Sequence, residues 1–199
     1  MRQLGMLAVI LLVNHSVATA QHEAQKAYRN FPVIITIQFH SLSLPFKNLA
    51  YNFSNVGLGL GTEVGFNGKQ DWVQQFQIGW IHNKNVGNRL LAYTQTTWRP
   101  TLSGNTYGEL KAGVGYAVAY HPTESFRHDN GTWVPVSHAG KGMLMIPIGV
   151  SVGYANYNED IYASPFISYQ VFALKGYSKS IPIMPEQMLQ AGSRIHLKY

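Results

Sequence analysis

From Phe31 onward, apolar and polar residues alternate along the chain with a period of two. In the stretch 33–40, for example, Val33 and Ile35 share one face, while Thr36 and Gln38 share the other. This period is typical of β-strands whose two faces meet different surroundings. The 3.6-residue apolar period of an amphipathic helix does not stand out anywhere in this region. The pattern therefore predicts an all-β fold.

Eight segments carry this alternation, and they lie in the ranges 33–40, 56–66, 72–80, 89–99, 109–120, 144–154, 161–171 and 189–199. Segment 89–99 is the least regular, because polar residues lie on both of its faces. The segments are about 8–12 residues long, near the roughly 9–11 residues of a tilted membrane-crossing strand and longer than the roughly 5–6 of an ordinary strand. Pro147 and Pro165 each remove a backbone donor within a segment, so we predict local bulges there.

The connections between the segments differ in length. Those after the second, fourth and sixth segments are short, whereas those after the first, fifth and seventh are longer. The stretch 121–140 is the longest of them. Short turns at one end and long loops at the other are typical of outer-membrane barrels. An even number of strands predicts that both chain ends lie on the short-turn side.

Alternation alone leaves open which face points inward. A soluble barrel turns its apolar face into a ligand cavity, whereas a membrane barrel turns that face toward lipid. Two features favour the membrane arrangement. The polar face is rich in Gly, Ser and Gln with few charges, and aromatic residues recur near the ends of the apolar face. Those aromatic residues are Trp72, Trp80, Tyr116, Tyr120, Tyr154 and Tyr199.

Residues 1–20 have the three parts of a secretory signal peptide. Arg2 provides the positive charge, an apolar run follows, and Ala18-Thr19-Ala20 is a small-residue cleavage site. The apolar run of about ten residues is too short for a membrane-spanning helix, which needs roughly 20. We therefore expect export, followed by a polar periplasmic lead over residues 21–30 and a barrel domain over residues 31–199.

The signal peptide, the eight long strands and the aromatic residue at Tyr199 together resemble the small eight-stranded outer-membrane β-barrel proteins of Gram-negative bacteria. The resemblance covers the whole mature chain, but it is one of architecture and includes no motif specific to one member. It implies an antiparallel up-and-down transmembrane β-barrel in the outer membrane, with outer-membrane lipids and the barrel-assembly machinery as partners. It also implies a non-catalytic role that is structural, adhesive or accessory to another envelope protein.

Composition excludes several other classes. The chain contains no Cys, so it has no disulfide, no thiolate metal site and no cysteine nucleophile. Its net charge is +6, but Lys and Arg are scattered, which argues against nucleic acid as a partner. An eight-stranded barrel is just wide enough for its own side chains, so a porin is not expected. The charged groups expected inside are Glu63, Glu109, Lys111, Arg99, Arg194, His196 and Lys198, and we expect the carboxylates to pair with the cations and form a structural plug.

Loop 121–140 concentrates the residue types that could act in catalysis: His121, Glu124, Ser125, His128, Asp129 and His138. Some eight-stranded barrels hydrolyse or transfer lipid A acyl chains, so such an activity is an alternative function. The His-x-Ser-Asn run of the hydrolases does not occur in this chain, however. The spacing of the three histidines matches no known metal-ligand pattern. We therefore expect no catalytic, cofactor-binding or metal-binding residue, and we keep a soluble exported barrel with an apolar ligand as a second alternative.

Overall fold

The computed structural model describes residues 31–41, 53, 55–66, 70–82, 87–120, 125–129, 131–136, 140–155, 161–176 and 183–197. The expected signal peptide and lead, residues 1–30, lie outside this part of the chain. The described residues contain no helix that is long and apolar enough to cross a membrane.

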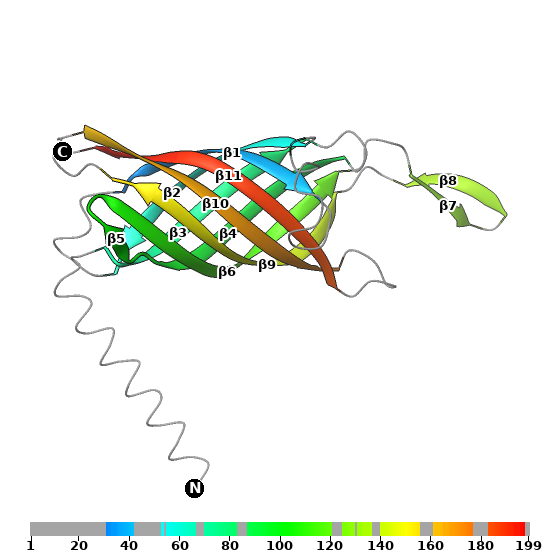
Figure 1. Cartoon of the computed structure of the whole chain (residues 1–199). Coiled ribbons are helices and arrows are strands. Elements are labelled where there is room, and N and C mark those ends of the chain that lie inside the picture. The colour runs from blue at the N-terminus through cyan, green and yellow to red at the C-terminus, as the bar shows by residue number, and fades with distance from the viewer. Residues whose placement is uncertain are drawn as a thin grey trace, which may run out of the picture.

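Eight antiparallel strands form a closed barrel (Figure 1). They are β1 (Val33–Ser41), β2 (Val56–Gly65), β3 (Trp72–Ile81), β4 (Asn88–Trp98), β6 (Thr106–Tyr120), β9 (Lys141–Tyr154), β10 (Ile161–Lys175) and β11 (Ile183–Leu197). Each barrel strand pairs with the next barrel strand along the chain, and β11 returns to pair with β1, which closes the sheet. The predicted all-β, eight-stranded antiparallel up-and-down barrel is therefore confirmed.

The connections divide the barrel into two ends, named here by their lengths. The strand ends that the connections 66–71, 99–105 and 155–160 join form the turn end, and the strand ends that 42–55, 82–87, 121–140 and 176–182 join form the loop end. The turn end is on the left in Figure 1, where the chain's C-terminus is marked.

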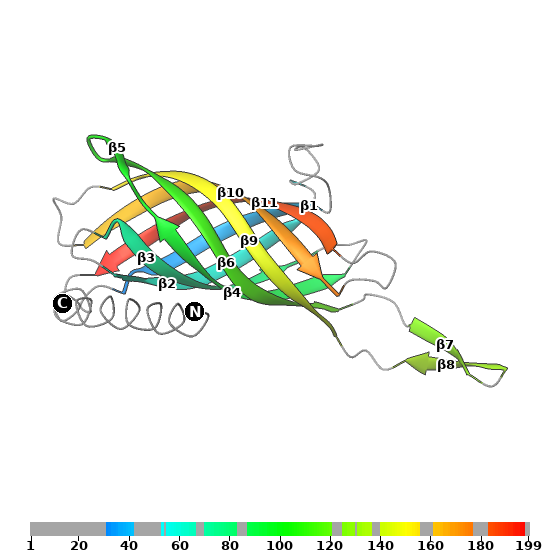
Figure 2. The ribbon, with the colours of Figure 1, turned by 90° about the horizontal axis from the view of Figure 1, so that it is seen from below.

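Three further strands lie outside the barrel wall. The short β5 (Thr101–Ser103) pairs with the start of β6 through a turn at Gly104, which has a φ of 52°. β7 (Ser125–Asp129) and β8 (Thr132–Val136) form a separate hairpin. Figure 2 shows this hairpin beyond the loop end of the barrel.

The β7–β8 hairpin corrects the interpretation of residues 121–140 as a loop without strands. Asp129 and Thr132 are paired, Gly131 before Thr132 has a φ of 82°, and the sequence at the two positions between the paired residues is Asn-Gly. An Asn-Gly pair between strand-forming residues is a strong hairpin signal, because both turn positions require positive φ. The sequence analysis missed this signal.

The expected bulges at the two prolines are wrong. The pairing of β10 with β11 runs through Pro165 without a change of register, and Pro165 precedes Phe166, where the pairing of β10 with β9 begins. Pro165 therefore lies just before the stretch in which β10 is paired with β9. At Pro147 the pairing of β9 with β6 skips Gly113 and Val114 but resumes in the same register. Each proline lacks a backbone donor, but neither proline shifts the register of its strand.

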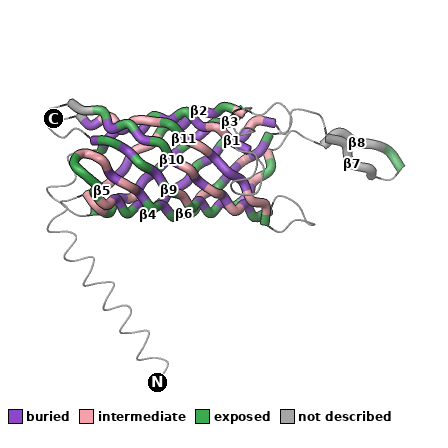
Figure 3. Tube along the Cα trace, in the orientation of Figure 1, coloured by how far each residue is buried: buried purple, intermediate pink, exposed green. Residues whose placement is uncertain are grey.

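Burial alternates along most of the barrel wall, as Figure 3 shows, although Glu186, Gln187 and Met188 of β11 are all buried. Leu58 on the outer face is 65% exposed, whereas Gln38 on the inner face is fully buried. Pairs of aromatic rings mark both ends of the outer face. Trp72 packs beside Trp98 at the turn end, with ring centroids 6.4 Å apart, and Trp80 packs beside Tyr120 at the loop end at 6.1 Å. The outer face therefore has an apolar belt between aromatic girdles, as membrane barrels do.

Candidate functional site

The barrel's polar face points inward, so the lumen is the candidate site that the fold builds. A soluble apolar-ligand carrier requires the reverse orientation, with the apolar face lining a cavity. The outer face instead exposes large apolar side chains, among them Leu60, Ile78, Val114 and Ile148. The orientation is that of a membrane barrel.

A cluster of charged residues fills the turn end of the lumen. Arg99 donates from Nη1 and Nη2 to the two carboxylate oxygens of Glu63, at 2.8 and 2.6 Å, and from Nε to Glu109 at 2.7 Å. Arg194 donates to both carboxylates as well, at 3.1 Å to Glu63 and 2.7 Å to Glu109. The Lys111 ammonium lies 2.9 Å from Glu109. All five residues are buried, and the predicted pairing of carboxylates with cations is confirmed.

Neutral side chains complete the coordination of this charged cluster. Tyr107 accepts a hydrogen bond from Arg194 Nη1 at 2.6 Å, and the Ser151 hydroxyl donates to Glu109. The Arg194 guanidinium lies 4.2 Å from the ring centroid of Phe166. Because buried charges are costly unless they are paired and hydrogen-bonded, these neighbours stabilise the cluster and favour a structural role.

A second charged group lies near the loop end and was missed by the sequence analysis. Glu186 pairs with His40 Nε2 at 2.9 Å and with the Arg89 guanidinium, and all three residues are buried. The segment expected at 189–199 begins too late to include Glu186, because β11 starts at Ile183. Glu186 has the same inward parity as Gln190, so extending the alternation backward along β11 finds it.

Amide and phenol groups lie between the two charged groups. Gln75 donates to Glu63 at 2.9 Å and accepts from Gln95 at 2.9 Å. Further along the axis, Tyr93 donates to Gln77 at 2.6 Å and accepts from Gln190 at 3.1 Å. Most of these bonds join neighbouring strands, whereas the bond from Gln190 on β11 to Tyr93 on β4 crosses the lumen.

Apolar side chains close the half of the lumen nearer the loop end. This cluster consists of Ile81, Leu91, Tyr93, Ala117, Ala119, Met143, Met145, Phe172, Leu174 and Met188. The inner face was expected to carry mostly small and polar residues, so the inward Met and Phe residues correct that expectation. This half of the described lumen also holds the buried Glu186, His40 and Arg89, so packed apolar side chains and paired charges fill it together.

The remaining candidates divide into those that the structure describes and those that it does not. His196 is buried at the turn end. Lys198, Tyr199, His121, Glu124 and His138 lie outside the described residues, as do the side chains of Ser125, His128 and Asp129. The catalytic and metal-binding alternatives for loop 121–140 therefore remain sequence-based hypotheses.

The chain matches no family model, and no curated protein resembles it in sequence. Its fold is similar to the crystal structure of Neisserial surface protein A, with a TM-score of 0.52 and 8% identity over 85% of this chain and 96% of that chain. Two other similar structures are the N-terminal β-barrel domain of Pseudomonas aeruginosa OprF (TM-score 0.43, 14% identity, 83% and 97% covered) and the Yersinia pestis outer membrane protein Ail (TM-score 0.40, 15% identity, 82% and 99% covered). At such low identity the first of these likenesses shows the fold alone, which is that of a small eight-stranded outer-membrane barrel.

Proposed function

We propose that this protein is a non-conducting, non-catalytic barrel of the outer membrane that acts through its outer surface and loops. The observation that carries the proposal is the filled lumen. A cluster of ion pairs occupies the turn end, and packed apolar side chains occupy the loop half. Because the interior is filled, the surfaces through which the barrel can act are the lipid-facing belt and the loops.

The proposed location is the outer membrane, reached by export through the signal peptide and insertion by the barrel-assembly machinery. The apolar belt between aromatic girdles supports contact with outer-membrane lipids. The proposed role is structural or accessory, in which the barrel supports the envelope or binds another envelope protein.

Cell fractionation tests the proposed location. We expect the chain in the outer-membrane fraction, with a gel mobility that shifts on boiling, because a folded barrel resists detergent until it is heated. A soluble protein without the shift would contradict the location.

Reconstitution into lipid vesicles tests the absence of transport. Vesicles that contain the purified barrel should swell no faster in small sugars than empty vesicles, whereas vesicles with a porin should swell rapidly. Sugar or ion flux through the wild-type barrel would contradict the proposal.

An acyl-release assay on lipopolysaccharide and phospholipid tests the catalytic alternative. We expect no release of fatty acid and no acyl transfer. The Ser125→Ala variant is the matched control for this assay. Release that disappears in this variant would replace the non-catalytic proposal with an acyl hydrolase or transferase.

A further inference from the structure

A polar patch interrupts the apolar belt on β3 and β4. The outer positions of β9 show the usual pattern, since all are apolar: Leu144, Ile146, Ile148, Val150, Val152 and Tyr154. Gln74, Thr94 and Thr96 stand instead at outer positions of β3 and β4, between the Trp72–Trp98 girdle pair and Trp80. A side-chain amide in contact with hydrocarbon is costly unless its donors and acceptors are satisfied.

The patch satisfies only part of its own hydrogen-bonding capacity. Gln74 Nε2 donates to Thr94 Oγ1 at 2.5 Å, and Thr96 Oγ1 donates to Gln74 Oε1 at 2.8 Å. Thr94 Oγ1 donates to the backbone oxygen of Gln75 at 3.0 Å. An amide can donate two hydrogen bonds and accept two, so these contacts use half of the capacity of Gln74. Within the part of the chain that the structure describes, these bonds leave one donor and one acceptor of Gln74 on the same patch.

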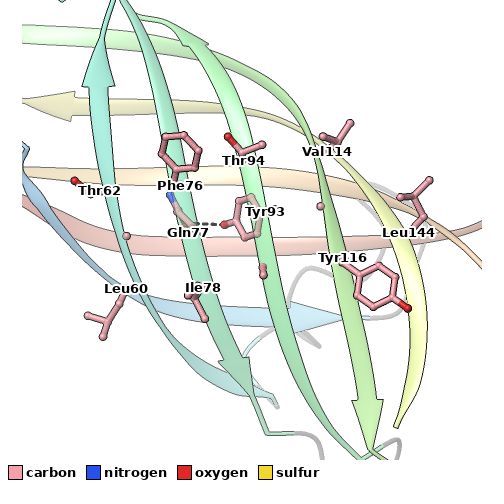
Figure 4. Close-up of a pocket in the computed structure, with 13 residues that line it drawn as sticks. Leu60, Thr62, Phe76, Gln77, Ile78, Tyr93, Thr94, Val114, Tyr116 and Leu144 are labelled. Carbon is pink, nitrogen blue, oxygen red and sulfur yellow. Dashed lines mark hydrogen bonds between the residues drawn. The ribbon is translucent and has the colours of Figure 1, made fainter.

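A groove of about 790 Å³ adjoins this patch on the outer surface (Figure 4). The outer residues of β4 here are the short Ala92 and Thr94, whereas the neighbouring strands carry the larger Phe76, Ile78 and Tyr116. The surface therefore has a protruding ridge on β3 directly beside a hollow on β4.

We propose that two copies of this chain associate in the membrane through this face of β3 and β4. A twofold axis parallel to the membrane normal brings equal depths of the two copies together, so the patch of one copy meets the patch of the other. The free donor of Gln74 in each copy then reaches the free acceptor of Gln74 or Thr96 in the other. Phe76 of each copy enters the hollow at Ala92 and Thr94 of the other.

The hydrogen-bonding groups of this face favour a second copy of the chain over a lipid tail as the molecule that covers it. An acyl chain fills an apolar groove, but it has neither donor nor acceptor for the Gln74 amide. A surface that carries a donor, an acceptor, a ridge and a hollow side by side is complementary to itself, which an interface between identical subunits requires. Within membranes, small residues and side-chain hydrogen bonds are the features that join protein surfaces.

Before side-chain relief is counted, the area of this face is smaller than that of a standard interface. The four strands β2, β3, β4 and β6, spaced about 4.8 Å apart over a belt about 25 Å tall, form a face of roughly 500 Å² before side-chain relief is counted. A standard interface buries roughly 800 Å² on each partner. Interdigitating side chains such as Phe76 and Tyr116 bring the face toward that size.

Cysteine cross-linking tests the interface directly, because the chain contains no Cys of its own. The Thr94→Cys variant, treated in intact outer membranes with a short thiol-specific bifunctional cross-linker, should form a cross-linked dimer on a denaturing gel, because the partner's Phe76 holds the two Thr94 positions too far apart for a direct disulfide. The matched control is Ile167→Cys on β10, a residue that is 62% exposed on a different side of the barrel and should not cross-link. Cross-linking at both positions or at neither overturns the proposal, and so does a Thr94→Cys product with a mass other than that of two copies.

Sedimentation equilibrium in detergent micelles tests the hydrogen bonds. Wild-type protein should sediment as a dimer, and the Gln74→Leu/Thr96→Val double variant should have a dimer dissociation constant at least about tenfold higher. The Ile167→Leu variant should match wild type, and heat-dependent gel mobility verifies that each variant is folded. A folded wild-type monomer, with or without a retained lipid in native mass spectrometry, overturns the dimer. This inference rests on the proposed membrane location, and a monomer that is still recovered from outer membranes leaves that location intact.

Discussion

Arg194 of β11 reaches across the lumen to Glu109 of β6, and its Nη2 atom lies 2.7 and 2.8 Å from the two carboxylate oxygens. Strands β9 and β10 separate β11 from β6 in the barrel wall. The same guanidinium donates from Nε to Glu63 on β2, on the other side of β1. One side chain therefore connects three strands that share no backbone hydrogen bonds, which opposes collapse or opening of the barrel wall.

Replacing this guanidinium should destabilise the barrel strongly. In Arg194→Met, Glu63 and Glu109 lose a shared cation while they remain buried. We expect the free energy of unfolding to fall by about 3–5 kcal/mol, the usual cost of removing one partner of a buried ion pair. Urea unfolding in lipid vesicles, followed by tryptophan fluorescence, measures this change.

A double variant separates charge pairing from simple loss of packing. Arg194→Met/Glu109→Gln removes a carboxylate together with its cation, so it should be more stable than the sum of the two single changes predicts. Additive effects of the two substitutions would show that the residues are not coupled.

The lipid-facing belt is tested by a charge at its middle. Val114 is 57% exposed on β6 and lies midway between Leu110, which is paired with Trp98, and Tyr120. Val114→Arg should cost about 2–4 kcal/mol of folding free energy in vesicles, because the arginine must enter hydrocarbon. The control Val114→Leu should fold as wild type does. Equal stability of the Arg and Leu variants would contradict a lipid contact at this position.

Close backbone approach makes the inward glycines of β2 sensitive to substitution. A Cβ added at Gly57 would lie 2.6 Å from the backbone oxygen of Trp80, so the β2–β3 backbone has to shift. We expect Gly57→Ala to lower stability by about 1–3 kcal/mol. At Gly108 the nearest atom is a Leu102 side-chain carbon at 3.4 Å, so Gly108→Ala should change stability by less than about 0.5 kcal/mol. Equal losses in the two variants, measured by urea unfolding, would contradict the close approach at Gly57.

The β7–β8 hairpin should be dispensable for folding, since its two strands pair with each other in a sheet separate from the barrel. Replacing residues 125–136 with a short glycine and serine linker should leave the heat-dependent gel mobility unchanged. The same variant should lose any binding or acyl-release activity that depends on this hairpin. Failure of the shortened chain to form a barrel would mean that the hairpin takes part in folding.

The fold was largely predictable because the alternation is a local property of the chain. The order of Leu58, Gly59 and Leu60 assigns each residue of β2 to one of two faces, since successive side chains of a strand point to opposite faces. The Asn130-Gly131 signal for a hairpin is also local and is present in the sequence. It was missed because the stretch 121–140 was interpreted from its polar composition.

The inner contacts were predictable in kind but not in detail. That Glu63 and Glu109 need cations follows from the cost of burying charge. Glu186 was not predicted as an inner residue because β11 extends further toward the loop end than the alternation indicated. The apolar residues Met145 and Phe172 were not predicted as inner residues because a membrane barrel was expected to carry polar side chains on its whole inner face.

By itself, the sequence determined most of the strands and which residues of a strand share a face, since both depend on neighbours along one strand. The tertiary structure alone decided which of these side chains meet. Arg194 is 85 residues from Glu109 and 131 from Glu63 along the chain, and the registers of the closed sheet bring all three to one depth. The same registers align Gln74 with Thr96 on the outer face. Register is a relation between strands, so it appears only when the barrel closes and the inner side chains pack against one another.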